Sequence, residues 1–176
     1  LRSAPTPGSA VLTGLRLENI ALIDSLDLAF DQGFSVLTGE TGAGKSILLD
    51  ALDAVLGGLQ TGAGGRLLRS GCNRGVIEAS FRPGAAASRW LLEQEITDGE
   101  EDLVVSREWR RQEERLSSRS RLNGVMVNRQ QLLVLRPLLI DLTVQGQTQQ
   151  LALPGQQKRW LDHLGGASLD DELSQV

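Results

Sequence analysis

The stretch "SVLTGETGAGKSILLDAL", Ser35–Leu52, joins a short apolar run to a glycine-rich turn and then to a helical pattern. Residues 34–38 predict a buried strand, because they are apolar and short. Residues 46–56 carry apolar side chains at helical spacing and stop at Gly57-Gly58, which predicts a helix. Between them, "GETGAGKS" fits the phosphate-loop pattern G-x-x-x-x-G-K-[ST] in the strand–loop–helix context that this motif requires. The stretch therefore predicts a nucleotide-binding site, against the alternative of a glycine-rich turn that only caps a helix.

The residue types of this loop suit a bound phosphate chain. Its glycines let backbone N–H groups surround the β-phosphate, and the helix N-terminus adds partial positive charge. Lys45 is one of only two lysines in the chain, the other sixteen basic residues being arginine. A lysine supplies a flexible point charge to the β- and γ-phosphates, where the rigid fork of arginine fits badly, and the Ser46 hydroxyl is expected to ligate Mg²⁺. The predicted nucleotide-binding residues are Gly39, Glu40, Thr41, Gly42, Ala43, Gly44, Lys45, Ser46 and Ile47.

Composition limits the classes of protein that remain. The chain has 176 residues, 40% of them hydrophobic, which fits one domain or a large piece of one and is enough to bury a core. Cys72 is the single cysteine and cannot form an internal disulfide, and no apolar run approaches the ~20 residues that span a bilayer. We therefore expect a soluble, cytoplasmic protein without a membrane partner. Residues 1–10 are expected to form a flexible leader, and the lone His163 and Cys72 are expected to be a surface residue and an unreactive thiol.

Hydrophobic patterning predicts alternating elements along the rest of the chain. An antiparallel pair is expected over 11–18 and 20–30, and "GLQTGAGGRLLRSG" is expected to be a mobile loop. Asn123-Gly124 is a strong hairpin signal, and Asn128 is expected to cap a helix over residues 129–135, with Pro137 ending it. The further predicted strands are 76–81, 103–109 and 138–144, and the further predicted helices are 85–96 and 154–164.

Arginine is concentrated in residues 107–121, "REWRRQEERLSSRSR", which hold six arginines and three glutamates. The preferred interpretation is a solvated hairpin laced with salt bridges. The alternative is a basic face directed at DNA, formed by Arg107, Arg110, Arg111, Arg115, Arg119 and Arg121. The formal net charge of −4 excludes a wholly basic nucleic-acid coat, although charge can still be segregated locally.

Flanking motifs narrow the class of phosphate-loop protein. The segment from Leu12 to Gly58 closely resembles the N-terminal segment of the bacterial DNA-repair branch of the SMC-like family of ABC-type ATPases. The resemblance continues through "RLLRSGCNRGVIEASF", through the hairpin "SRSRLNGVMVNRQQLLVL" and through "LLIDLTVQGQTQQLALPGQQKRWLDHLGG", which is similar to the Q-loop strand and the helix after it. It covers about Val11 to Gly166.

The resemblance implies an α/β fold: a P-loop NTPase of the ABC/SMC-type ATPase head, N-terminal lobe, with an antiparallel β portion. It implies a lobe over 11–166 and the start of a coiled-coil helix over 167–176, with ATP and Mg²⁺ as cofactors. Lys45 and a Q-loop glutamine would be catalytic, and Ser46 and that glutamine would hold the metal. The branch usually has "HGQHxHQ" here, whereas this chain has "TVQGQTQQ". A gapless match puts the glutamine at Gln145, with Gln147 as the rival and a purely polar loop as the third reading.

Two parts of an ABC-type site do not occur in the sequence. No apolar run ending in "DE" follows the Q-loop, and no "SGGE"-like signature loop is found. The family places both in a C-terminal half beyond a coiled coil. The resemblance therefore implies these partners: the C-terminal half of the same head, a second copy through the coiled coil and ATP-engaged heads, DNA, and a recombinase.

The implied activity is ATP hydrolysis coupled to DNA double-strand-break repair, in a nucleoid-associated, cytoplasmic protein. This chain alone is expected to be inactive. The alternatives are a self-contained P-loop nucleotide or small-molecule kinase, and a DNA-tethering module that binds ATP without hydrolysing it.

Overall fold

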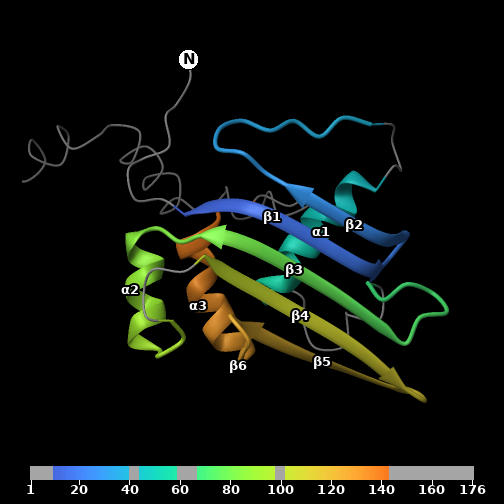
Figure 1. The fold of residues 1–176 in the computed structure, drawn as a ribbon. Helices are drawn as coiled ribbons and strands as arrows, with labels where there is room; N and C mark the ends of the chain where they lie inside the picture. Colours follow the sequence, from blue (N-terminus) through green and yellow to red (C-terminus); the bar gives the residue numbers. More distant parts are fainter. Residues whose placement is uncertain (1–9, 40–43, 59–66, 98–101, 143–176) are drawn as a thin grey trace, which may run out of the picture. The chain divides into compact units, whose positions relative to one another are not determined.

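A six-stranded antiparallel sheet with three helices makes up the described structure (Figure 1). The structure is a computed structural model, and it describes residues 10–39, 44–58, 67–97 and 102–142. Strand order across the sheet is β2-β1-β3-β4-β5-β6. The elements are β1 (Val11–Ile20), β2 (Ile23–Ala29), α1 (Lys45–Val55), β3 (Arg74–Arg82), α2 (Ala85–Glu93), β4 (Leu103–Gln112), β5 (Arg115–Leu122), β6 (Val125–Val127) and α3 (Arg129–Leu139).

The sheet has one apolar face and one polar face, because alternate residues of a strand point to opposite sides. In β4, Leu103, Val105 and Trp109 are buried, while Val104 and Arg110 are exposed. The helices pack on the apolar face, since the buried residues of all three belong to the same hydrophobic cluster as these strand residues. The opposite face, called here the outer face, carries most of the charged side chains of the sheet.

Local signals explain most element ends. Gly44 adopts φ 89° as the N-cap of α1, and Gly57 adopts φ 82° just after the helix, conformations that favour glycine. α3 begins with a capping box, in which the Asn128 side chain accepts from the Gln131 N–H and the Gln131 side chain accepts from the Asn128 N–H. Asn123 and Gly124 both have positive φ, as a type I′ hairpin turn requires. These predictions are confirmed, as is the antiparallel pairing of β1 with β2.

The predicted buried strand at residues 34–38 is wrong. This segment is irregular, and the exposed fractions of Phe34, Val36 and Leu37 are 93%, 64% and 50%. The physical reason lies in the pairing: β1 already has β2 on one side and β3 on the other, and no strand of the described sheet pairs with residues 34–38. An apolar run becomes a buried strand only when neighbouring strands are present to satisfy its backbone.

Two other predictions differ from the structure. α3 does not end at Leu135, before Pro137, but continues to Leu139, since buried Leu132, Leu135 and Leu139 hold it against the core at helical spacing. Consequently Leu138 and Leu139 are helical and do not start a strand. The predicted mobile loop is wrong at its end, where Leu67 and Leu68 are buried and Leu67 accepts a hydrogen bond of 2.6 Å from the Ala21 N–H.

Candidate nucleotide-binding site

The described part of the phosphate loop lies at the N-terminal end of α1. Gly44 caps the helix, Lys45 and Ser46 form its first turn, and the Ile47 N–H donates to the Gly44 carbonyl at 3.0 Å. Leu48, Ala51 and neighbouring residues on the same side of α1 are buried in the core, so the helix is fixed to the sheet along its length. The sequence thus places backbone N–H groups and the positive end of the helix dipole where the motif requires them.

Lys45 connects the two ends of the motif. Its ammonium group donates a hydrogen bond to the Gly39 carbonyl, six residues earlier in the chain. Because an ammonium has three donors, it can keep this bond and still donate to phosphate oxygens. The Ser46 side chain is exposed one residue further on, where its hydroxyl can reach a cation held by those phosphates.

Several predicted site residues fall outside the described residues. These are Glu40, Thr41, Gly42 and Ala43 of the loop, the glutamines Gln145 and Gln147, and His163. The division of the chain into 1–10, 11–166 and 167–176 also stays a prediction. Within the described ranges no group of three or more His, Cys, Asp and Glu residues is placed to hold a metal ion. A phosphate-bound Mg²⁺ does not need such a group, because the phosphates, water and one hydroxyl supply its oxygen ligands.

The arginine-rich run forms the β4–β5 hairpin, as the preferred interpretation predicted. The predicted basic face is wrong for Arg107 and for Arg111, because strand register places both on the side of β4 opposite Arg110. Arg107 is the clearer case. This side chain lies on the apolar side of β4 with 7% of its surface exposed, and it donates to the Ala54 carbonyl at 2.8 Å. The alternation of apolar and polar residues in β4 could have predicted this burial, because position 107 falls on the same face as Leu103, Val105 and Trp109.

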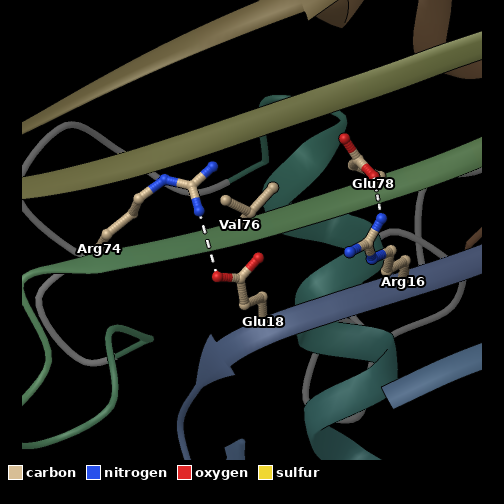
Figure 2. Close-up of a pocket in the computed structure, with 5 residues that line it drawn as sticks. All are labelled: Arg16, Glu18, Arg74, Val76 and Glu78. Carbon is tan, nitrogen blue, oxygen red and sulfur yellow. Dashed lines mark hydrogen bonds and ion pairs between the residues drawn. The ribbon is translucent and has the colours of Figure 1, made fainter. Parts of the chain in front are cut away.

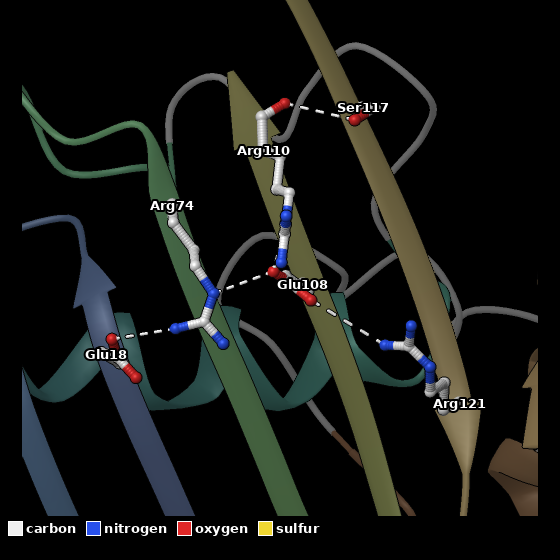
Figure 3. Close-up of polar contacts among 6 residues, drawn as sticks. All are labelled: Glu18, Arg74, Glu108, Arg110, Ser117 and Arg121. Atoms are coloured by element: carbon white, nitrogen blue, oxygen red, sulfur yellow. Dashed lines mark hydrogen bonds and ion pairs between the residues drawn. The ribbon is translucent and has the colours of Figure 1, made fainter. Parts of the chain in front are cut away.

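Glu108 collects three arginines on the outer face (Figure 3). Its carboxylate lies 2.6 Å from Arg110 Nε, 2.8 Å from Arg74 Nε and 3.9 Å from Arg121 Nη1. Hydrogen bonding to Arg110 and then to Arg74 lowers the pKa of Glu108, and partial burial opposes this shift. The hydrogen bond to Glu108 also raises the pKa of Arg74. The carboxylate is therefore ionised and surrounded by a local excess of positive charge.

A shallow pocket of about 110 Å³ lies further along the same face, over β1 and β3 (Figure 2). Its charged residues form ion pairs with one another. Arg74 Nη1 lies 3.1 Å from Glu18 Oε1, and Arg16 Nη1 lies 3.8 Å from Glu78 Oε2. Strand register places seven arginines and four carboxylates on the outer face. The arginines are Arg16, Arg74, Arg82, Arg110, Arg115, Arg119 and Arg121, and the acids are Glu18, Asp27, Glu78 and Glu108.

The fold and the helix-borne phosphate loop agree with the comparisons with known proteins. The sequence matches the AAA domain family over residues 14–165, and the chain belongs to that family. Among solved structures, it is similar to a chain from a study of the ATP-driven dimerization and DNA-stimulated activation of SMC ATPases. That likeness has a TM-score of 0.63 and 19% identity, over 87% of this chain and 98% of that one. The Smc head domain from Pyrococcus furiosus gives a TM-score of 0.57 at 20% identity, over 73% of this chain and 33% of that one. The predicted fold class is confirmed.

Its curated relatives are DNA repair proteins named RecN. The chain is 53% identical to RecN of Synechocystis over 160 residues, which is 90% of this chain and 27% of that protein. It is 35% identical to RecN of Vibrio cholerae over 161 residues, 89% of this chain and again 27% of the relative. The chain therefore spans about a quarter of the length of these relatives, and the resemblance to the DNA-repair branch is confirmed. In the described part of the chain, no helix is long and apolar enough to cross a membrane.

Proposed function

We propose that this chain is the ATP-binding half of an SMC-like ATPase head that acts in DNA double-strand-break repair. The observation that carries the proposal is the phosphate loop at the start of α1, with Lys45 bonded back to Gly39, in a chain similar to RecN over nine tenths of its length. The alternative of a self-contained P-loop kinase is not favoured, because neither the relatives nor the structural neighbours are kinases.

In this proposal the residues of the loop divide the work on ATP. Backbone N–H groups from Gly39 to Ile47 surround the phosphates, and Lys45 compensates the negative charge that develops between the β- and γ-phosphates. Ser46 would contribute one oxygen ligand to Mg²⁺, which would supply positive charge at the phosphates. Gln145 would orient the attacking water and complete the Mg²⁺ ligands, with Gln147 as the rival. These groups suffice for binding ATP. Efficient hydrolysis also needs the positioning and charge compensation that the Walker B acid and the signature motif would supply in the transition state.

The first proposed partner is the C-terminal half of the same head, which would supply the Walker B acid and the signature motif. The exposed apolar segment around Phe34, Val36 and Leu37 supports this partner. These side chains directly precede the phosphate loop, and water-exposed apolar groups in a row indicate a surface that another part of the protein covers. About three quarters of the length of the relatives lies outside the matched part, and a C-terminal half within that length would be able to cover the apolar segment.

The remaining proposed partners are a second copy, DNA and a recombinase. A second copy would engage through a coiled coil and through ATP held between two heads, in a cytoplasmic, nucleoid-associated protein. For DNA, the outer face offers seven arginines against four carboxylates, and among the described residues Arg115 and Arg119 have no ion-pair partner. Arginine is well suited to phosphate recognition, which makes this face the proposed DNA surface.

ATP hydrolysis by the full-length protein tests the proposal. We expect DNA-stimulated turnover in the wild type and none above background in Lys45→Ala, with an unchanged circular dichroism spectrum. Lys158→Ala is the matched control, since Lys158 is the only other lysine. Equal turnover in Lys45→Ala and wild type would exclude the proposed site.

A further inference from the structure

Three arginines from two other elements hold the C-terminal end of α1. Arg107 of β4 donates from Nη1 to the Ala54 carbonyl at 2.8 Å. Arg129 of α3 donates from Nε to the Gly57 carbonyl at 2.9 Å. Arg136, one α3 residue before Pro137, places Nη2 2.6 Å from Asp53 Oδ1. The contacts lie within five residues of one another on the α1 side, so they act on one end of the helix.

The packing around this end leaves little freedom to move. A Cβ added to Gly57 would lie 3.1 Å from the Leu132 Cβ, and one added to Gly58 would overlap the Asp53 carboxylate. The side chains of Asp53 and Arg136 are only 13% and 19% exposed, so solvent screens their ion pair weakly. Gly57 thus lets α3 pack closely against the end of α1, and Gly58 leaves room for the Asp53 carboxylate that forms the pair.

Burying Arg107 costs desolvation free energy that an apolar core side chain would not. Burial and the nearby charge of Arg129 lower the pKa of Arg107, yet a guanidinium starts so far above neutrality that it stays charged. It is held by Ala54, by the Ser118 hydroxyl at 3.3 Å and by the Trp109 ring, whose centroid is 5.1 Å away. An apolar side chain of similar size commonly packs as well or better than a buried charge. What an arginine adds is a fixed direction toward the negative end of a helix.

The other end of α1 carries the phosphate loop. An α-helix rises about 1.5 Å per residue and moves as one body, so the eleven residues from Lys45 to Val55 transmit a shift of one end to the other. The position of Gly44, Lys45 and Ser46 relative to the sheet thus depends on what holds the far end as well as on the core packing along the helix. Misplacement of a phosphate-binding group by about 1 Å is enough to weaken its contribution strongly.

We propose that Arg107, Arg129 and Arg136 are positioning residues for ATP, which act through α1 to hold the phosphate loop in its binding position. The Asp53–Arg136 pair is the part that can be tested without touching the loop. This inference rests on the proposed function, since it presumes that the loop binds ATP. It adds residues that lie at the opposite end of the helix from the nucleotide.

Titration of the full-length protein with a fluorescent ATP analogue and Mg²⁺ tests the inference at 25 °C, with the folded fraction and Tm of each variant measured by circular dichroism. Arg136→Gln removes the pair, and Asp53→Asn removes its charge while keeping its shape. We expect each to raise the Kd for the analogue roughly fivefold to tenfold while fully folded at the temperature of the titration. Arg136→Lys should restore part of the affinity, and the double variant should bind no more weakly than Arg136→Gln. Arg89→Gln, an exposed arginine of α2, is the matched control and should leave Kd unchanged.

The outcomes separate the inference from the function on which it rests. If wild type binds and Lys45→Ala does not, the ATP site stands, and the pair variants then decide the inference. A lowered Tm with Kd within twofold of wild type in both Arg136→Gln and Asp53→Asn would reduce the pair to a structural role and overturn it. Failure of the wild type to bind, or equal binding by Lys45→Ala, would overturn the proposed function itself.

Discussion

At the scale of single residues, the less exposed of two outer-face glutamates has more arginine partners. Glu108 is 14% exposed and accepts from two arginines, whereas Glu78, on the neighbouring strand, is 38% exposed and has one partner at 3.8 Å. A partly buried carboxylate needs such donors, because an unpaired charge there would be costly. The two glutamates therefore differ in what they contribute to stability, although the sequence alone makes them look alike.

We predict that Glu108→Gln lowers stability at neutral pH and weakens its dependence on acid. Arg110 and Arg74 depress the pKa of Glu108 in the folded state below its ordinary value of 4.5. A depressed pKa contributes stability that is present above the ordinary value and is lost as pH falls through the folded value. The expected loss at pH 7 is about 1 kcal/mol, measured by urea denaturation. The difference from wild type should shrink below pH 4.5. Glu78→Gln, the control, should change little, and an equal effect of both substitutions would contradict the assignment.

We predict that Gln145→Ala in the full-length protein lowers kcat with little change in ATP affinity. A side chain that orients water and Mg²⁺ acts more on the transition state than on ground-state binding. Steady-state ATPase kinetics and analogue titration measure the two effects separately. Gln147→Ala is the comparison: a defect equal to or larger than that of Gln145→Ala would move the proposed catalytic glutamine by two residues.

At the scale of elements, local chemistry decided what the sequence could predict. α1, the Asn123-Gly124 turn and the start of α3 depend on glycine conformations and a cap within a few residues, and all three were predicted. The predicted strand at residues 34–38 was wrong, because whether an apolar run pairs as a strand depends on neighbours that are not local in the sequence. The end of α3 was missed for a related reason, since packing of Leu139 outweighs the local preference of Pro137.

We predict that arginines on the outer face of the sheet contribute to DNA binding. We expect Arg110→Gln, Arg119→Gln and Arg121→Gln together to weaken DNA binding by the full-length protein. The dependence of log Kd on log salt should flatten by roughly 0.7 to 0.9 per lost phosphate contact. ATP affinity should not change, because these residues lie on the side of the sheet opposite α1. Fluorescence anisotropy at several salt concentrations measures the slope, with Arg89→Gln as control.

Two features of the hairpin bear on that experiment. Arg107 is left out of the triple variant because it is buried. Glu113 and Glu114 lie at the exposed tip of the hairpin, where their negative charge offsets that of nearby arginines only. The triple variant also breaks two ion pairs of Glu108, so its Tm must be measured alongside. A folded triple variant with the wild-type salt slope would leave the hairpin as a solvated, salt-bridged surface, and the DNA surface would then lie elsewhere in the full protein.

At the scale of the whole molecule, the motif that defines the candidate site is local in the sequence, whereas the contacts that support its helix are not. Lys45, Ser46 and Gly39 follow from a motif within eight residues, and the structure brings Lys45 and Gly39 together. Arg107 and Ala54 are 53 residues apart, and Arg129 and Gly57 are 72 apart. No local pattern encodes such pairings, which follow only from strand register and helix packing. The support of the phosphate loop therefore became visible only in the structure.

The last prediction concerns this chain by itself. Residues 1–176 should bind ATP weakly and hydrolyse almost none, because a Walker B acid and a partner's signature loop are absent from the sequence. Both groups would act on the attacking water and the γ-phosphoryl group that is transferred to it, so their loss removes turnover more completely than binding. Adding the C-terminal half of the full protein as a separate chain should restore hydrolysis, measured as phosphate release, and should cover the segment around Phe34, measured as reduced hydrogen exchange there. Lys45→Ala in the same mixture is the control for contaminating ATPases. Robust hydrolysis by residues 1–176 alone that is lost in Lys45→Ala would mean that the site is complete, and would revive the self-contained enzyme as the better explanation of this phosphate loop.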